Sequence, residues 1–268
     1  MAKLTTFEVG YCTHPLCMVQ QGAGLGVCKF PAQAWLIEVH DMKWLWDTGY
    51  AEHFHAATRS GLFQLYRKMT PVTFNAYESM QQQLSLIGIE SDAINHVIIS
   101  HFHADHIAGL ADFPNSQFIC SKQAWSKTKK LRGIKALKRA FIPTLIPNNF
   151  EQRVEFIESF ECCTLPEALL PFTHGYVLPN SEQQVFLVDL PGHAAGHIGA
   201  FVQTEQGWVL LASDAAWTKE NYQNLKKPSH LAYVIMDDAK AYNETLNKLH
   251  QLSKNGQVKI YLSHEGSQ

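Results

Sequence analysis

Short apolar runs separated by polar turns mark the first part of the chain. Residues 34–40 (Ala-Trp-Leu-Ile-Glu-Val-His) and 43–46 (Lys-Trp-Leu-Trp) are rich in β-prone side chains, and the polar turn between them predicts a hairpin that enters the core. Residues 77–90 have the apolar spacing of a helix. Residues 97–100 (Val-Ile-Ile-Ser) then predict a buried strand that ends directly before His101.

A second alternation of strands and helices follows in the later part of the chain. Residues 184–188, 207–211 and 258–262 have the composition of strands, and residues 239–253 have that of a helix. Side chains of the kinds that bind metals come just after several of these elements. A rigid sheet that presents loops to one cleft would account for this placement.

The segment between the two halves is strongly basic. Its apolar residues recur at roughly helical spacing, which favours an amphipathic surface helix over residues 121–150. The alternative is a lid over a cleft, with a basic face that attracts an anionic substrate or product. We expect one domain over residues 1–268, with a helical, lid-like insertion at about 121–180. The basic residues of the segment are Lys122, Lys127, Lys129, Lys130, Arg132, Lys135, Lys138 and Arg139.

Composition excludes several classes of protein. A net charge of -2 and a pI near 6.7 provide no general attraction for nucleic acid or for an anionic membrane surface. No apolar run approaches the roughly 20 residues that cross a bilayer, and the N-terminus does not resemble a secretory signal. The six cysteines form no CxxC pair, so we expect them to be mostly reduced and the protein to be cytoplasmic.

Fourteen histidines, several of them in short clusters, point to metal binding. In His101-Phe102-His103, alternate residues that leave a strand point to the same side, so both imidazoles can reach one cation. Asp105 and His106 follow a turn of the chain and can address a second position nearby. A polar surface loop is the alternative, but burying these groups without a cation would be costly.

Three further segments accompany this HxHxDH motif, in a fixed order along the chain. They are Leu190-Pro191-Gly192-His193-Ala194-Ala195-Gly196-His197, Ala212-Ser213-Asp214-Ala215-Ala216 and Leu262-Ser263-His264. Together the four segments resemble the motifs of the metallo-β-lactamase superfamily, and the resemblance extends from Asp47 to His264. It implies an α/β fold, the four-layer αβ/βα sandwich of metallo-β-lactamase type, and a hydrolase with a dinuclear metal centre.

The resemblance also implies seven metal ligands. It assigns one ion to His101, His103 and His193, the other ion to Asp105, His106 and His264, and a bridging role to Asp214. His197 and Asp47 are expected to support these ligands and not to bind metal themselves. The cofactors are therefore two divalent ions, with zinc as the first candidate, although the mixed His and Asp ligands also suit iron, manganese or cobalt.

The same resemblance suggests the reaction. The nucleophile would be a metal-bridging hydroxide, which Asp105 can orient or deprotonate. Residues 214–222 are similar to the segment that follows the bridging aspartate in N-acyl homoserine lactonases, so opening of a lactone ring is the leading hypothesis. Trp217 stands where those enzymes usually have a tyrosine, and an indole N–H can donate a hydrogen bond but cannot exchange a proton. Either that role is lost, or Tyr222 or another group assumes it.

Other activities use the same motif. A thioesterase of glyoxalase II type would add a basic C-terminal helical region, whereas this sequence ends four residues after His264. A mononuclear iron persulfide dioxygenase and a non-catalytic ligand-binding protein are further alternatives. His103 argues against flavodiiron oxidoreductases, and the charge balance argues against nucleases. The expected partner is a small-molecule ester, lactone or thioester, and the sequence specifies no oligomeric state.

Overall fold

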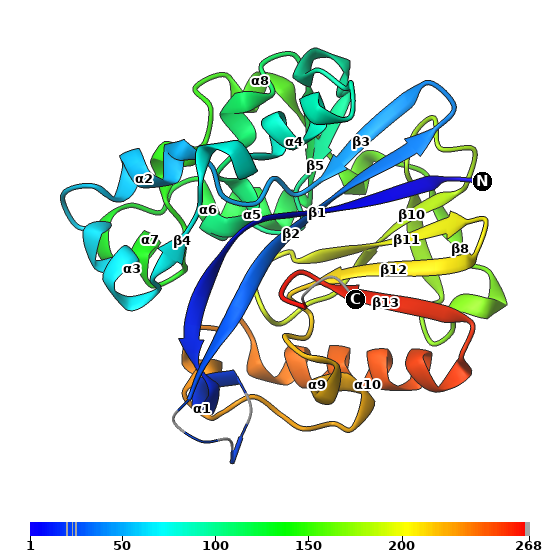
Figure 1. Cartoon of the computed structure of the whole chain (residues 1–268). Coiled ribbons are helices and arrows are strands. Elements are labelled where there is room, and N and C mark those ends of the chain that lie inside the picture. The colour runs from blue at the N-terminus through cyan, green and yellow to red at the C-terminus, as the bar shows by residue number, and fades with distance from the viewer. Residues whose placement is uncertain (20, 23, 25, 266–268) are drawn as a thin grey trace.

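Two β-sheets stack face to face in the computed structural model, which describes residues 1–19, 21, 22, 24 and 26–265 (Figure 1). The first sheet has seven strands in the order β4-β1-β2-β3-β5-β6-β7, and its β3-β5-β6-β7 half is parallel. Its strands are β1 (Lys3–Pro15), β2 (Val27–Val39), β3 (Met42–Trp46), β4 (Val72–Thr73), β5 (His96–Ile98), β6 (Gln117–Cys120) and β7 (Val154–Phe156).

The second sheet has six strands in the order β13-β12-β11-β10-β9-β8. All neighbouring pairs are antiparallel except β12 and β13, so the carboxyl ends of these two strands lie side by side. Its strands are β8 (Cys162–Thr164), β9 (His174–Val177), β10 (Val185–Asp189), β11 (Ile198–Thr204), β12 (Gly207–Ser213) and β13 (Val258–Leu262).

Helices cover the outer faces of both sheets (Figure 1). The α-helices are α1 (Leu16–Val19), α2 (Glu52–Thr58), α3 (Gln64–Met69), α4 (Met80–Leu86), α5 (Ala104–Ile107), α6 (Lys122–Thr128), α7 (Gly133–Leu137), α8 (Phe150–Arg153), α9 (Lys219–Gln223) and α10 (Ala239–Asn255). Short 3-10 turns lie at Ala76–Glu78, Ser91–Ala93, Leu110–Asp112, Pro143–Leu145, Ile157–Ser159, Glu167–Leu169 and Ala232–Val234.

Alternation along the central strands explains the four layers. In β2, Trp35 and Ile37 belong to the buried cluster shared by the two sheets, whereas Leu36 belongs to the cluster that faces the helices. In β10, Leu187 packs between the sheets and Phe186 packs toward the helices. Because successive side chains of a strand point to opposite faces, each central strand needs an apolar layer on both sides. The expected four-layer αβ/βα sandwich is therefore confirmed.

Most predicted elements are present, but the segment at 121–180 differs from the prediction. It is helical only as far as α8; β7 then joins the first sheet, and β8 and β9 join the second. Residues 129–132 separate α6 from α7, which begins at Gly133 with a φ of +55°, so no continuous helix covers residues 121–150. Strands β7, β8 and β9 are only three or four residues long, which is too short for a recognisable pattern in the sequence. The role of the segment as a lid, and a single domain over residues 1–268, stay predictions.

Two other observations bear on the expected compartment. All six cysteines are free, in agreement with the expectation that no disulfide scaffold holds the chain. Within the described residues, every helix is too short or too polar to span a bilayer. The cytoplasmic location itself stays a prediction.

Helix α10 fixes the loop that carries His193. The side chain of Asp238 caps the helix by accepting hydrogen bonds from the main-chain N–H groups of Lys240 and Ala241, at 2.8 and 3.0 Å. The main-chain N–H of Asp238 donates to the carbonyl of Gly192 at 2.9 Å. Gly192 has a φ of +127°, and a Cβ at this position would overlap the main chain of Tyr242 in α10. The loop can therefore approach the helix this closely only with glycine at residue 192.

We expect Gly192→Ala to lower the free energy of unfolding by about 2–5 kcal/mol, because it combines backbone strain with overlap against α10. Gly207→Ala is the matched control: Gly207 has a φ of +108°, but no atom lies within 4 Å of the added Cβ. It should cost only the strain, about 1–2 kcal/mol. Urea unfolding of both variants measures the difference, and equal losses would contradict the close approach.

Candidate metal centre

The candidate ligands come together where strands of both sheets end. Asp105 and His106 lie in α5, and the candidate His103 directly precedes this helix. Strand ends give a rigid origin to each loop, which suits a site that must hold several side chains in register. The other four candidates are His101 after β5, His193 after β10, Asp214 after β12 and His264 after β13.

These side chains form two clusters, and within each cluster the donor atoms lie within 4.8 Å of one another. The first cluster contains His101, His103, His193 and Asp214, and the second contains Asp105, His106 and His264. In the first cluster, His193 Nε2 lies 3.0 Å from His103 Nδ1 and 3.2 Å from Asp214 Oδ2.

Asp214 faces both clusters. Its Oδ2 lies 3.0 Å from His264 Nε2, and its Oδ1 lies 3.5 Å from His106 Nε2. Asp105 Oδ2 completes the second cluster, at 3.6 Å from His106 Nε2 and 3.7 Å from His264 Nε2. The carboxylate of Asp214 thus occupies the position that a bridge between two cations requires.

The imidazoles of the first cluster are neutral. Burial is the main cause that lowers the pKa of His101 and of His193 well below the usual value; neighbouring imidazoles add to the shift, and Asp214 opposes it at His193. Burial likewise lowers the pKa of His103 to about 4, although Asp105 and Asp214 oppose the shift. A neutral imidazole keeps a free lone pair, which is the form that binds a metal.

The second cluster attracts positive charge. Burial opposes a charge on His106, but the carboxylates of Asp105, Asp47 and Asp214 outweigh it and raise its pKa to about 10. Burial opposes a charge on His264 as well, and Asp214 and Asp105 again prevail and raise its pKa. Three carboxylates in a buried region therefore create a site that favours a cation.

The donor atoms have the spacing that a metal centre needs, and several of them have no hydrogen-bond partner in the described part of the chain. His101 Nε2, His106 Nε2 and Asp214 Oδ1 are buried and have no hydrogen-bond partner among the described residues. Two ligands that each lie about 2.0–2.1 Å from a tetrahedral ion are roughly 3.3 Å apart. The imidazole nitrogens and carboxylate oxygens of the two clusters are 3.0–3.7 Å apart, which brackets this value. The residues fit two divalent ions.

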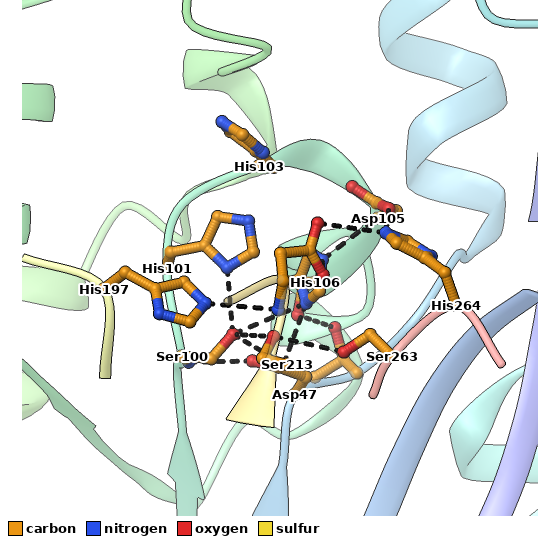
Figure 2. A network of polar contacts seen from close by, with 12 residues as sticks. Asp47, Ser100, His101, His103, Asp105, His106, His197, Ser213, Ser263 and His264 are labelled. Carbon is orange, nitrogen blue, oxygen red and sulfur yellow. Dashed lines mark hydrogen bonds and ion pairs between the residues drawn. The ribbon is translucent and has the colours of Figure 1, made fainter. Parts of the chain in front are cut away.

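A buried hydrogen-bond network holds the ligands in place (Figure 2). Asp47, fully buried after β3, accepts the main-chain N–H of Ser100 at 2.8 Å, the hydroxyl of Ser100 at 2.7 Å and Nδ1 of His106 at 2.8 Å. The ring nitrogen of His264 that faces away from the cluster, Nδ1, lies 2.9 Å from the carbonyl of Pro31. Such partners fix the ring orientation and leave Nε2 for the metal.

Three serines of this network were not predicted from the sequence. Ser100, Ser213 and Ser263 lie in contact, with Oγ separations of 2.9 and 3.1 Å (Figure 2). Because a hydroxyl has one hydrogen and that of Ser100 goes to Asp47, Ser213 donates to Ser100 and Ser263 donates to Ser213. The signal was present in the sequence, since each serine directly precedes a candidate ligand: His101, Asp214 and His264 respectively.

His197 takes part through the main chain. Its Nδ1 lies 3.1 Å from the carbonyl of Leu190, and its Nε2 accepts a hydrogen bond from the main-chain N–H of Asp214 at 3.3 Å. Burial is the main cause that lowers the pKa of His197 to about 3, so the ring is neutral. With both nitrogens engaged, His197 connects the loop of His193 to the start of the Asp214 segment.

The two aromatic residues that the sequence singled out lie in different surroundings. The ring centroid of Trp217 is 5.9 Å from that of His193 and 6.3 Å from that of Phe30, which in turn lies 5.0 Å from His264. Tyr222 is buried in α9, and burial together with the charge of Glu265 raises its pKa to about 12. Within the described residues, the ring of Trp217 pairs with that of His193, whereas no hydrogen bond, ion pair or aromatic pair joins Tyr222 to a candidate ligand.

A cavity of about 240 Å³ lies beside the first cluster. His103 and His193 line it, and Phe102, Leu131 and Ile235 provide apolar wall. It is a position from which part of a bound molecule could extend away from the metal ligands.

Comparisons with known proteins agree with this geometry. Residues 29–158 match the Metallo-beta-lactamase superfamily. An N-acyl homoserine lactonase from Bacillus thuringiensis is 28% identical to the chain over 206 residues, which cover 73% of this chain and 68% of that protein.

Solved structures show the same fold. An N-acyl homoserine lactone hydrolase, with the product N-hexanoyl-L-homoserine at its catalytic metal centre, superposes with a TM-score of 0.75 at 23% identity, covering 98% of this chain and 92% of that chain. A dizinc quorum-quenching lactonase in complex with the same kind of product has a TM-score of 0.67 at 14% identity, covering 98% and 87%. Residues 29–158 thus match the metallo-β-lactamase superfamily, and the chain as a whole shares the fold of these lactonases.

Proposed function

We propose that the two clusters hold two divalent metal ions and that Asp214 bridges them. The shared position of the Asp214 carboxylate and the spacing of the donor atoms support this assignment. Zinc is the first candidate, because imidazole suits it and a lactonase of the same fold is described as dizinc. Iron, manganese and cobalt accept the same ligand types.

We further propose that the protein hydrolyses the ester bond of lactones. The observation that carries this proposal is the convergence of seven candidate ligands on two adjacent positions, since a purely structural zinc ion is normally enclosed by four. The sequence relative from Bacillus thuringiensis acts on N-acyl homoserine lactones by its name, and the product-bound structure shares the fold. These two relatives favour lactones over other esters as the substrates of this protein.

In this mechanism the protein's own groups position the reactants. Two divalent ions in the clusters would supply a nucleophile from water near neutral pH and would polarise the ester carbonyl. Asp105, about 10% of whose side chain is exposed, is placed to orient the attacking water and to accept its proton. Trp217, beside His193, can donate its indole N–H to the reacting carbonyl or to the leaving oxygen. Tyr222 is the weaker candidate for this hydrogen bond, because among the described residues it has no hydrogen bond or aromatic pair with a candidate ligand.

The metal assignment predicts a loss of metal in Asp214→Ala. Without the bridging carboxylate, we expect the metal content to fall from two tightly held ions to at most one per chain, as measured by mass spectrometry of metals after dialysis. His197→Ala is the matched control, because it removes a buried imidazole 3.3 Å from the Asp214 main chain and should retain both ions. Two ions in the Asp214 variant, or the loss of one in the His197 variant, would contradict the assignment.

The proposed reaction is tested by acid release from a panel of substrates. The zinc- or cobalt-loaded protein is given homoserine lactones, simple γ-lactones and acyl thioesters, with a chelated sample as the control. We expect metal-dependent turnover of lactones that clearly exceeds that of thioesters. Turnover of thioesters alone would move the assignment to a thioesterase, and inactivity on all three classes would overturn hydrolysis of these esters.

The proposed role of Trp217 predicts a defect in Trp217→Phe. Loss of a hydrogen bond from the indole N–H should reduce kcat for lactones by roughly tenfold, the upper range for one neutral hydrogen bond. Trp208→Phe makes the same substitution in β12, where the indole packs on Phe186, and should leave kcat unchanged. A larger loss in Tyr222→Phe than in Trp217→Phe would instead give the role to Tyr222.

A further inference from the structure

The cavity beside the first cluster is lined by two basic residues as well as by apolar wall. Lys127 of α6 and Arg139, just after α7, line it together with His103 and His193. The cavity thus joins the proposed metal position to two cationic side chains. Its volume of about 240 Å³ is enough for a short carbon chain with a polar end.

The segment that supplies Lys127 and Arg139 is poorly neutralised. Residues 121–150 contain eight Lys and Arg and no Asp or Glu, although the whole chain has a net charge of -2. Among the described residues, ion pairs engage only two of the eight: Lys129 with Glu151 and Arg139 with Asp237. Lys127, which lines the cavity, is among the cations without an ion pair in the described structure, so its charge is available to attract an anion.

Arg139 is held in place with part of its guanidinium free. Its Nη1 lies 3.3 Å from Asp237 Oδ1 and donates to the carbonyl of Met236 at 3.2 Å. Its Nε and Nη2 have no partner among the described residues, and such a pair of N–H groups can bind a carboxylate in a bidentate manner. The segment around Asp237 thereby anchors the arginine while a second anion can still bind it.

The charges also select the kind of anion. Asp237 lines the cavity together with Lys127 and Arg139, so at the end away from the metal ligands two cations and one carboxylate give a net charge of +1. A monoanion balances this charge, whereas a phosphate dianion would leave an excess of negative charge beside Asp237.

We propose that this cavity binds the carboxylate end of the substrate and that the protein prefers lactones whose side chain ends in a carboxylate. The inference rests on the proposed lactone hydrolysis. The lactone carbonyl lies at the metal ligands, the carbon chain packs between Phe102, Leu131 and Ile235, and the carboxylate pairs with Lys127 and Arg139. Lys127 and Arg139 are thus specificity-determining residues.

The test compares two matched γ-lactones whose side chains end in a methyl group or in a carboxylate. The corresponding lactams, in which nitrogen replaces the ring oxygen, report binding to the zinc-loaded protein by calorimetry without turnover. We expect the carboxylate to improve both the affinity of the lactam and kcat/KM of the lactone by at least roughly tenfold, the effect of one charge-assisted hydrogen bond. Lys127→Gln and Arg139→Gln should each remove most of this preference.

Lys130→Gln is the control, because Lys130 belongs to the same basic segment but does not line the cavity. It should retain the preference. Equal affinities of the two lactams, no binding of the anionic lactam, or an equal loss in the Lys127 and Lys130 variants would each overturn the proposal. Tighter binding of a phosphate-terminated lactam would overturn the choice of a monoanion.

The outcomes separate the two proposals. Turnover of the neutral lactone without any preference for the carboxylate leaves lactone hydrolysis in place and removes only the anion site. Preferential binding of the anionic lactam without turnover of either lactone retains the anion site and removes the proposed reaction.

Discussion

The buried carboxylate of Asp47 is the constraint on which the site depends. It follows β3 and holds β5 through the main chain and hydroxyl of Ser100, and it holds α5 through Nδ1 of His106. From Ser100 the hydroxyl chain continues to Ser213 and Ser263, at the ends of two strands of the opposite sheet. A single buried acid therefore ties the ligand-bearing ends of both sheets into one network. Such a network is stable only if its members remain paired, which makes it intolerant of substitution.

The two clusters differ in the charge they favour, and the difference follows from which groups surround them. The first cluster has three imidazoles whose burial keeps them neutral, so it offers lone pairs. In the second cluster, Asp105 and Asp214 face two imidazoles and raise their pKa, so it requires positive charge. Asp214 contacts both. A cation in the second cluster would replace protons that the carboxylates otherwise hold on His106 and His264.

The sequence predicts the centre of the site better than its surroundings, for a physical reason. Residues 101–106 lie next to one another in the chain, so their spacing alone shows that they can meet, and buried strands such as β3 and β13 have apolar runs that are easy to recognise. The cavity, by contrast, forms where residues 102–103, 127–139, 193–195 and 235–237 meet, and no local pattern encodes that contact. The short strands β7–β9 were missed because three or four residues show no recognisable pattern, and pairing with neighbouring strands, not their own composition, makes them strands.

This division between strand ends and loops has a consequence for function. The candidate ligands originate from strand ends and α5, whereas Lys127, Arg139 and Ile235 originate from short helices and turns outside the sheets. Changes in the second group can alter which molecule binds without moving the first group. Trp217 is intermediate, since it follows Asp214 by three residues but contributes its ring to the wall of the site. Substitutions at Trp217 and in the basic segment should therefore change substrate preference more than the class of reaction.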